Sequence, residues 1–251
     1  MRILLTNDDG IDAAGITILA KQLKENGHEI TIVAPDKEQS ATSHSITLHQ
    51  PLRIIKRAEN KYAVTGSPAD CIILASTVIK AKPFDLVISG INSGRNMGED
   101  ILYSGTVAAA LEAMLMGYKA IAVSLTSFKD QNFEAAATIL NNMLDNGLPE
   151  LIGEREVFNI NIPNIAVEEI EGIKITETGH RKYQDFVSEQ KDPRGRKIYW
   201  IGGGEPLWSK VGDTDFKAIF QNYVSISPIS PNFTNRNSFS KIQKWLDNIE
   251  K

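Results

Sequence analysis

Two adjacent carboxylates, Asp8 and Asp9, follow a short apolar run at residues 3–6 after a single intervening residue, Asn7. Neighbouring carboxylates repel each other, and this repulsion lowers stability unless a cation or good hydrogen bonds compensate for it. A divalent ion such as Mg²⁺ or Mn²⁺ would compensate, because both ions favour oxygen ligands. The segment Asn-Asp-Asp-Gly is also good turn chemistry. The pair therefore indicates either a metal site or a polar turn.

Two further oxygen donors, Ser40 and Asn92, lie in segments that follow other expected strands. Residues 36–45 follow an expected strand over 29–34, and the glycine-rich residues 90–98 follow one over 86–89. Strand-helix-strand spacing implies parallel strands, so these segments should meet Asp8 and Asp9 at the ligand-binding edge of the sheet. The four side chains would leave positions for water and a phosphate oxygen. Because several hydroxyls share the Ser40 loop, a simple turn role also fits that residue.

A second group of residues could hold phosphate. The glycine-rich segment could expose backbone amides, and Ser104, Gly105 and Thr106 open a helix whose first N–H groups and positive dipole end attract anions. The alternative is that the glycines make tight turns and that Ser104 or Thr106 caps the helix. No Walker A sequence is present, and the glycine-rich segment is a poor dinucleotide fingerprint.

The elements that would position these residues alternate between buried strands and helices. This alternation predicts an α/β fold, with a mostly parallel sheet flanked by helices. Strands are expected over residues 3–6, 29–34, 86–89, 120–124, 157–162 and 223–228, and helices over 13–26, 67–80, 107–116, 132–146 and 238–249. The region through Val64 is expected to be irregular and extended.

The C-terminal part has a different pattern. Strand-like residues 185–188 and 197–201 flank a turn at 191–195, which predicts a projecting β-hairpin. We therefore expect one domain over residues 1–251, with an α/β core at 1–170 and a hairpin arm and terminal segment at 171–251. Aromatic residues of this part could stack on a base, although packing or interface roles are more usual for them. They are Tyr199, Trp200 and Trp208.

The composition excludes several classes of protein. The chain of 251 residues has a net charge of −4, which argues against general binding of a nucleic-acid duplex. Its single cysteine, Cys71, allows no intrachain disulfide and no cysteine-based zinc site, and its four histidines lack metal-ligand spacing. No apolar run reaches the roughly 20 residues of a membrane span. These features lead us to expect a cytoplasmic protein with no membrane partner.

Five motifs occur along the chain, namely ILLTNDDG at 3–10, APD at 34–36 with QS at 39–40, GSPADC at 66–71, GINSGRNMG at 90–98 and YSGTVAAA at 103–110. Their combination resembles the SurE family, metal-dependent 5'-nucleotidases named for stationary-phase survival. The resemblance implies a three-layer Rossmann-like fold and a homodimer or homotetramer in which C-terminal segments pair between subunits. It implies that Asp8, Asp9, Ser40 and Asn92 bind the metal and that Asn96 and residues 104–106 lie near the phosphate. Ala41 and Ser67 depart from the family pattern, which usually has Gly and Thr there.

The expected function is hydrolysis of nucleoside 5'-monophosphates by metal-activated water, with one Mg²⁺ or Mn²⁺ per subunit and with Asp8 and Asp9 as catalytic residues. Activity on 3'-nucleotides or polyphosphate stays open. One alternative is a phosphatase with an aspartyl-phosphate intermediate. Others are a phosphoacceptor signalling module, which lacks its third aspartate here, and a nucleotide-binding protein without catalysis.

Overall fold

The computed structural model describes residues 1–79, 83–182, 187–201, 207–208 and 212–249. Within these residues nine strands form one sheet in the spatial order β3-β4-β2-β1-β5-β6-β7-β13-β8, and the pairs from β4 to β7 are all parallel. Strand β3 is antiparallel to β4, and β13 is antiparallel to β7. The prediction of a mostly parallel α/β sheet is confirmed. The strands are β1 Arg2–Thr6, β2 Glu29–Pro35, β3 Ile54–Ala58, β4 Lys61–Val64, β5 Leu86–Ser93, β6 Ala120–Leu125, β7 Val157–Ile162, β8 Gly172–Ile175 and β13 Tyr223–Ile229.

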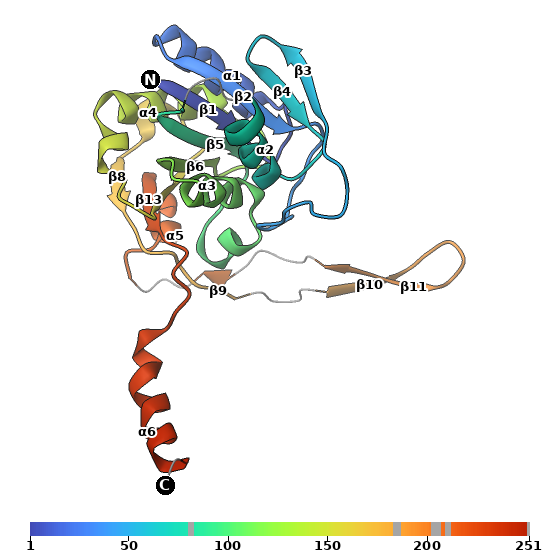
Figure 1. The fold of residues 1–251 in the computed structure, drawn as a ribbon, viewed down its shortest axis with the longest axis vertical. Coiled ribbons are helices and arrows are strands. Elements are labelled where there is room, and N and C mark those ends of the chain that lie inside the picture. The colour runs from blue at the N-terminus through green and yellow to red at the C-terminus, as the bar shows by residue number, and fades with distance from the viewer. Residues whose placement is uncertain (80–82, 183–186, 202–206, 209–211, 250–251) are drawn as a thin grey trace.

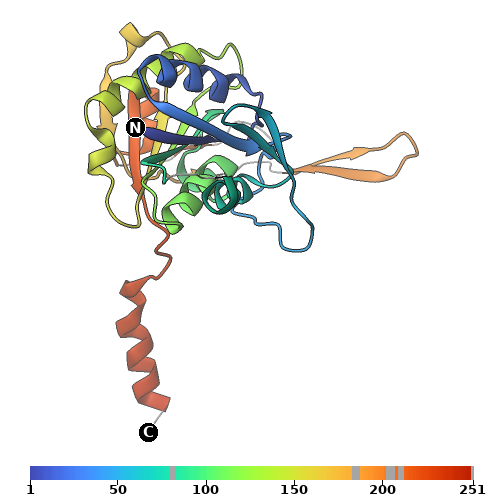
Figure 2. The same cartoon turned by 45° about the horizontal axis from the view of Figure 1, so that its top comes forward.

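Helices cover both faces of this sheet, because alternate residues of a buried strand point to opposite faces. On β1, Ile3 and Leu5 belong to the apolar cluster of α1 and α4, whereas Leu4 belongs to that of α2 and α3. Figure 2 shows the blue α1 and the green α3 on opposite sides of the central strands. The three-layer prediction is thus confirmed. The helices are α1 Ala14–Glu25, α2 Pro68–Leu74, α3 Gly105–Leu115, α4 Phe133–Asp145, α5 Asp215–Phe220 and α6 Phe239–Ile249.

Strand β5 differs from the prediction in a way that matters for the site. It continues from Leu86 through Ser93, so residues 90–93 are strand and the expectation of a loop there is wrong. A register shift between Ser89 and Asn92 interrupts its pairing with β6. A side chain at Gly90 would lie 2.2 Å from the carbonyl oxygen of Val123, so only glycine allows the strands to pack this closely.

Other elements were predicted incompletely. The region before residue 64, expected to be irregular, forms the hairpin β3–β4 at one end of the sheet, and β8 and α5 were not predicted. Helix α2 ends at Leu74 and continues as a π-helical turn, Ala75–Ile79, while Lys80 lies outside the described residues. The shorter elements are β9 Arg181–Lys182, β12 Leu207–Trp208 and the 3₁₀ helices η2 Gly98–Leu102, η3 Leu148–Leu151, η4 Val167–Glu169 and η5 Arg236–Ser238.

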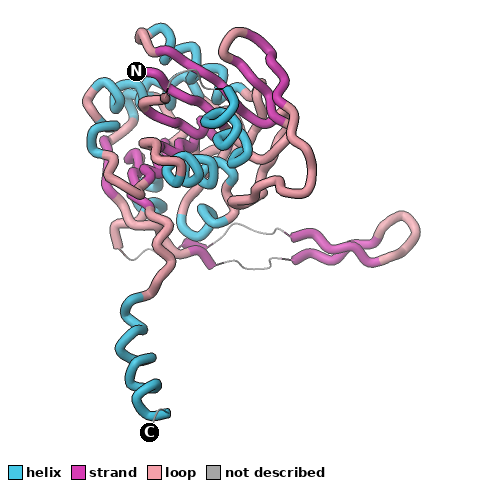
Figure 3. Tube along the Cα trace, viewed as in Figure 1, coloured by secondary structure: helices cyan, strands magenta, loops and turns pink. Residues whose placement is uncertain are grey.

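Two segments project from the body of the molecule (Figures 1 and 3). Strands β10 (Val187–Lys191) and β11 (Lys197–Ile201) form the predicted hairpin, and every residue of both strands is exposed. Expected strand residues 185 and 186 lie outside the described part. Helix α6 follows the predicted range closely and buries none of its residues. No helix in the described part of the chain is long and apolar enough to cross a membrane.

Candidate active site

Asp8 lies where β1 ends, and only 5 % of its surface is exposed. The Thr106 hydroxyl at the start of α3 donates a hydrogen bond to its Oδ1 atom. Gly105 packs so closely that an added Cβ would lie 2.8 Å from the Asp8 Cβ and 2.9 Å from its Oδ2. Burial raises the pKa of Asp8, and hydrogen bonds from Thr106 and Gly105 oppose this rise. The beginning of α3 therefore fixes Asp8 and stabilises its charged form.

Asp9 lies next to a different strand. Its Oδ2 atom accepts a hydrogen bond of 3.0 Å from the backbone N–H of Ser93 at the end of β5. Burial raises the pKa of Asp9 to about 6, and the negative charges of Asp8 and Glu38 add to this effect. A cation placed between Asp8 and Asp9 would reverse that repulsion.

Ser40 and Asn92 lie on either side of this pair. The backbone N–H of Gln39 donates to the Asp8 carbonyl at 2.7 Å, which brings the loop after β2 against the end of β1. Ser40 is exposed, and its hydroxyl donates to Glu38 at 2.8 Å. Asn92 lies within β5, and its side-chain nitrogen donates to the Gly94 carbonyl at 2.9 Å. The oxygen of the Asn92 amide is therefore the group left for a ligand.

Asn96 is 7 % exposed and lies within a buried network of polar side chains. Its backbone N–H donates to Asn161 at 2.9 Å, and its side-chain nitrogen donates to Ser124 at 2.8 Å. Its carbonyl oxygen accepts from Asn159 and Asn161, each at 2.9 Å. Sequence reasoning missed these partners. The signal was the pair of asparagines spaced two apart in the otherwise apolar strand β7.

Ser104 and Thr106 have other partners within the protein. The Ser104 hydroxyl accepts from the backbone N–H of Val107 at 3.1 Å, as an N-cap does. The Thr106 hydroxyl is fully buried and donates to Asp8. The backbone N–H groups of Gly105 and Thr106 also bond to Asp8, whereas the Ser104 hydroxyl can still donate its own hydrogen to a ligand.

Asp215, at the start of α5, ties the glycine-rich segment to the C-terminal part of the chain. It is fully buried, and it accepts hydrogen bonds from the backbone N–H groups of Gly98 at 2.8 Å and Gly179 at 3.0 Å. Burial raises its pKa. Nothing in the local sequence identified this carboxylate, because its partners are backbone groups far away in the chain.

The donors at this edge match the chemistry of a hard divalent cation. No group of three or more His, Cys, Asp or Glu side chains suited to a metal exists among the described residues. A metal site at Asp8 and Asp9 therefore needs the Ser40 hydroxyl and the Asn92 carbonyl as well. Two carboxylates, one buried and one half-buried, together with two neutral oxygens fit Mg²⁺ or Mn²⁺ better than zinc.

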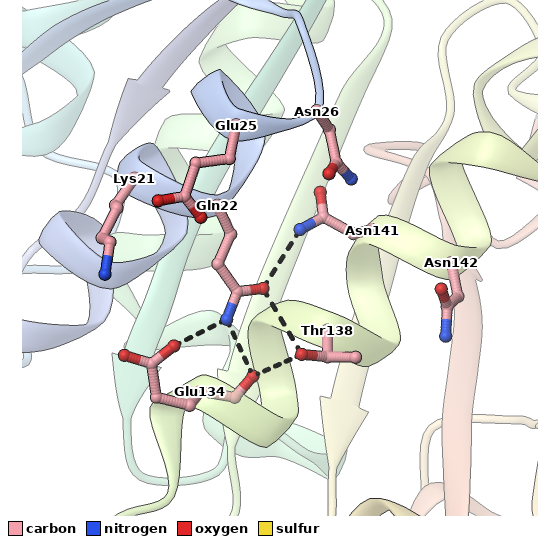
Figure 4. A pocket seen from close by; sticks show the side chains of 8 residues that line it. All are labelled: Lys21, Gln22, Glu25, Asn26, Glu134, Thr138, Asn141 and Asn142. Atoms are coloured by element: carbon pink, nitrogen blue, oxygen red, sulfur yellow. Dashed lines mark hydrogen bonds between the residues drawn. The ribbon is translucent and has the colours of Figure 1, made fainter.

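A pocket of about 310 Å³ lies elsewhere, between α1 and α4 (Figure 4). Its polar side chains bind one another. The Gln22 side chain donates to Glu134 at 2.7 Å and accepts from Asn141 at 3.2 Å. None of the candidate residues lines this pocket, so it is separate from the site at Asp8.

Comparisons with known proteins identify relatives of this chain. A protein named 5'-nucleotidase SurE from Carboxydothermus hydrogenoformans is 46% identical and covers 100% of this chain and 98% of its own length. One of the same name from Histophilus somni (strain 2336) is 45% identical over 98% of this chain and 99% of its own. The crystal structure of the SurE protein from Aquifex aeolicus superposes with a TM-score of 0.85 and 38% identity, over 98% of this chain and 100% of that one. The family model described as survival protein SurE matches residues 3–185, and the chain therefore belongs to the SurE family.

Proposed function

We propose that this protein is a metal-dependent 5'-nucleotidase that hydrolyses nucleoside 5'-monophosphates to nucleoside and phosphate. The relatives that it matches along their full length carry the name 5'-nucleotidase SurE. The observation that carries the proposal is the adjacent carboxylate pair, buried Asp8 and half-buried Asp9, at the carboxyl edge of a parallel sheet. Ligands of open α/β sheets bind at this edge.

The proposed ligands of one divalent ion per subunit, Mg²⁺ or Mn²⁺, are Asp8, Asp9, Ser40 and Asn92. A bound ion would supply positive charge for the phosphate oxygens and lower the pKa of water. The hydrogen bond from the Thr106 hydroxyl fixes the orientation of the Asp8 carboxylate before the ion binds. Asp9 accepts a hydrogen bond from the backbone N–H of Ser93, and its carboxylate is proposed to accept the proton of the attacking water.

The phosphate is proposed to lie at the start of α3. The positive dipole end of this helix favours an anion there, and the Ser104 hydroxyl, which accepts from Val107, can still donate its own hydrogen to a phosphate oxygen. Asn96 is proposed to support this position through the glycine-rich segment, since its backbone is fixed by Asn159 and Asn161. Activity on 3'-nucleotides or polyphosphate would use the same residues.

The alternative functions are not favoured by the comparisons, because the relatives are named as 5'-nucleotidases. An aspartyl-phosphate enzyme would use Asp8 or Asp9 as a nucleophile. The Thr106 hydroxyl and the tight packing of Gly105 occupy the surroundings of Asp8, which speaks against that use. A nucleotide-binding protein without catalysis would show no turnover in the experiment below.

We propose that the protein forms a homodimer or homotetramer through its projecting hairpin and α6. Both segments expose apolar side chains, among them Trp200, Phe239 and Trp245, which are each more than half exposed. Large exposed apolar surface of this kind usually marks an interaction site. We also expect the protein to act in the cytoplasm, where Cys71 would stay reduced.

The test is phosphate release from a panel of nucleoside 5'-monophosphates, with Mg²⁺ or Mn²⁺ added and again after chelation. Wild type is compared with Asp9→Asn and with the control Asp12→Asn, which removes an exposed carboxylate paired with Lys61. We expect metal-dependent release that Asp9→Asn abolishes and Asp12→Asn retains. Absence of release from every nucleotide with either metal would refute the proposed function.

A further inference from the structure

Phe128 is an exposed aromatic residue in the loop between β6 and α4. Its side chain is 70% exposed, yet its ring lies directly against the glycine-rich segment. A Cβ added at Gly94 would lie 2.2 Å from Cε1 of this ring and 2.6 Å from Cζ. One part of the ring therefore rests on the backbone of Gly94, and the remainder is open to solvent.

The loop that carries Phe128 is held in place by several hydrogen bonds. The backbone N–H of Gly94 donates to the Leu125 carbonyl at 3.0 Å. The Gln131 side chain donates to the Ser93 hydroxyl and, at 2.8 Å, to the Ser127 carbonyl. These bonds join both ends of the loop to the end of β5. The ring is thus presented by a fixed support, which limits the entropy lost when a ligand packs on it.

The same segment reaches the proposed metal ligands. The backbone N–H of Ser93 donates to Asp9, and the side chain of Asn92 donates to the Gly94 carbonyl. Two residues of extended chain span at most about 7 Å, so the backbone under the ring of Phe128 lies within that distance of Asn92. If the phosphate of a substrate is bound beside Asp8 and Asp9, the rest of the substrate has only a short distance to span before it contacts the Phe128 ring.

We propose that Phe128 is the platform on which the nucleobase of the substrate stacks. The inference deepens the proposed 5'-nucleotidase function and rests on it. Stacking on a phenyl ring requires no particular hydrogen-bonding pattern, because every base has an aromatic face. Phe128 would therefore select nucleotides over sugar phosphates while accepting both purines and pyrimidines.

Two exposed aromatic residues of the hairpin fit this role less well. Tyr199 and Trp200 lie on the hairpin that projects from the body of the molecule (Figure 1). The Trp200 ring nitrogen donates to Gln190 of the same hairpin at 3.2 Å. The ring of Phe128 instead lies against Gly94, next to Ser93, whose backbone N–H donates to Asp9.

The test compares Phe128→Ala and Phe128→Trp with wild type on adenosine 5'-monophosphate and on ribose 5-phosphate, which lacks the base. Phe220→Ala is the control, because it removes a phenyl ring that is 91% exposed on α5. We expect Phe128→Ala to raise KM for the nucleotide about tenfold with kcat little changed, since base stacking on aromatic rings contributes on this scale. Values for ribose 5-phosphate should stay within about twofold, and Phe128→Trp should restore the nucleotide KM.

Binding of adenosine, which cannot be hydrolysed, provides a second readout by calorimetry. Weaker adenosine binding by Phe128→Ala would support the stacking platform even if the protein hydrolysed no substrate. Absence of hydrolysis would refute the nucleotidase proposal and leave the platform standing. Unchanged KM and unchanged adenosine binding would overturn the platform. Equal losses on both phosphates would also overturn it, because they would mean that Phe128 merely supports the loop.

Discussion

Replacing Thr106 with valine would test how Asp8 is held. The substitution keeps the branched shape of the side chain and removes the hydroxyl that donates to the buried Asp8 carboxylate. A hydrogen bond to a charged group contributes about 1.5–3 kcal/mol, and loss of a partner that orients a metal ligand commonly weakens metal binding about 10- to 100-fold. We therefore expect Thr106→Val to need about 10- to 100-fold more Mn²⁺ for half-maximal phosphate release.

The pKa of Asp8 strengthens this expectation. Its hydrogen bond with Thr106 lowers that pKa against the effect of burial, so the valine variant should raise it further. A carboxyl that holds its proton more tightly binds a cation less well, and the deficit should grow as the pH is lowered.

Two measurements are needed, namely the Mn²⁺ dependence of phosphate release and calorimetric Mn²⁺ binding without substrate. The matched control is Thr106→Ser, which keeps the hydroxyl and loses a buried methyl group. It should bind Mn²⁺ within about threefold of wild type while losing about 1 kcal/mol of unfolding free energy. Wild-type Mn²⁺ affinity in Thr106→Val, or equal losses in both variants, would refute the role assigned to the hydroxyl.

Two smaller predictions concern stability. Ala41 has a φ of 56°, a left-handed conformation that glycine adopts without strain, so Ala41→Gly should stabilise the protein by about 0.5–1 kcal/mol in urea unfolding; a loss of stability would contradict this account. The pKa of His28 is lowered from 6.5, chiefly by burial and then by the N-terminal charge, so the unfolded chain binds the proton more readily. The stability that neutral His28 contributes is present above pH 6.5 and is lost as the pH falls from 6.5 through the lower pKa of the folded protein. Between these two pH values, His28→Gln should lose less stability than wild type. Thermal melts over a pH series would reveal the difference.

Much of the site could be predicted because it depends on strand direction. Asp8 and Asp9 end the first strand, and the Ser40 loop ends the next, so a parallel arrangement brings them together. The hydrogen bond from Gln39 to Asp8 agrees with that reasoning. Whether the four side chains bind a metal stays a prediction.

The parts that were missed depend on contacts between distant residues. Glycine at position 90 suggested a loop, yet here it lets β5 continue beside Val123. Thr106 resembled a phosphate-binding residue, whereas its hydroxyl is bound to Asp8, 98 positions earlier. Strand β3 has no buried residue and so gave little apolar signal before it paired with β4.

The position of Asp215 has a consequence for the order in which the protein is built. Among the described residues, strand β8 joins the sheet through β13 alone, which is synthesised about fifty residues later. The backbone N–H of Gly98, at the end of the glycine-rich segment, likewise waits for Asp215. Domains begin to fold during synthesis from the N-terminus. A nascent chain that already contains Asp8, Ser40 and Asn92 therefore still lacks the carboxylate that secures the end of this segment, and a chain truncated before α5 would never obtain it.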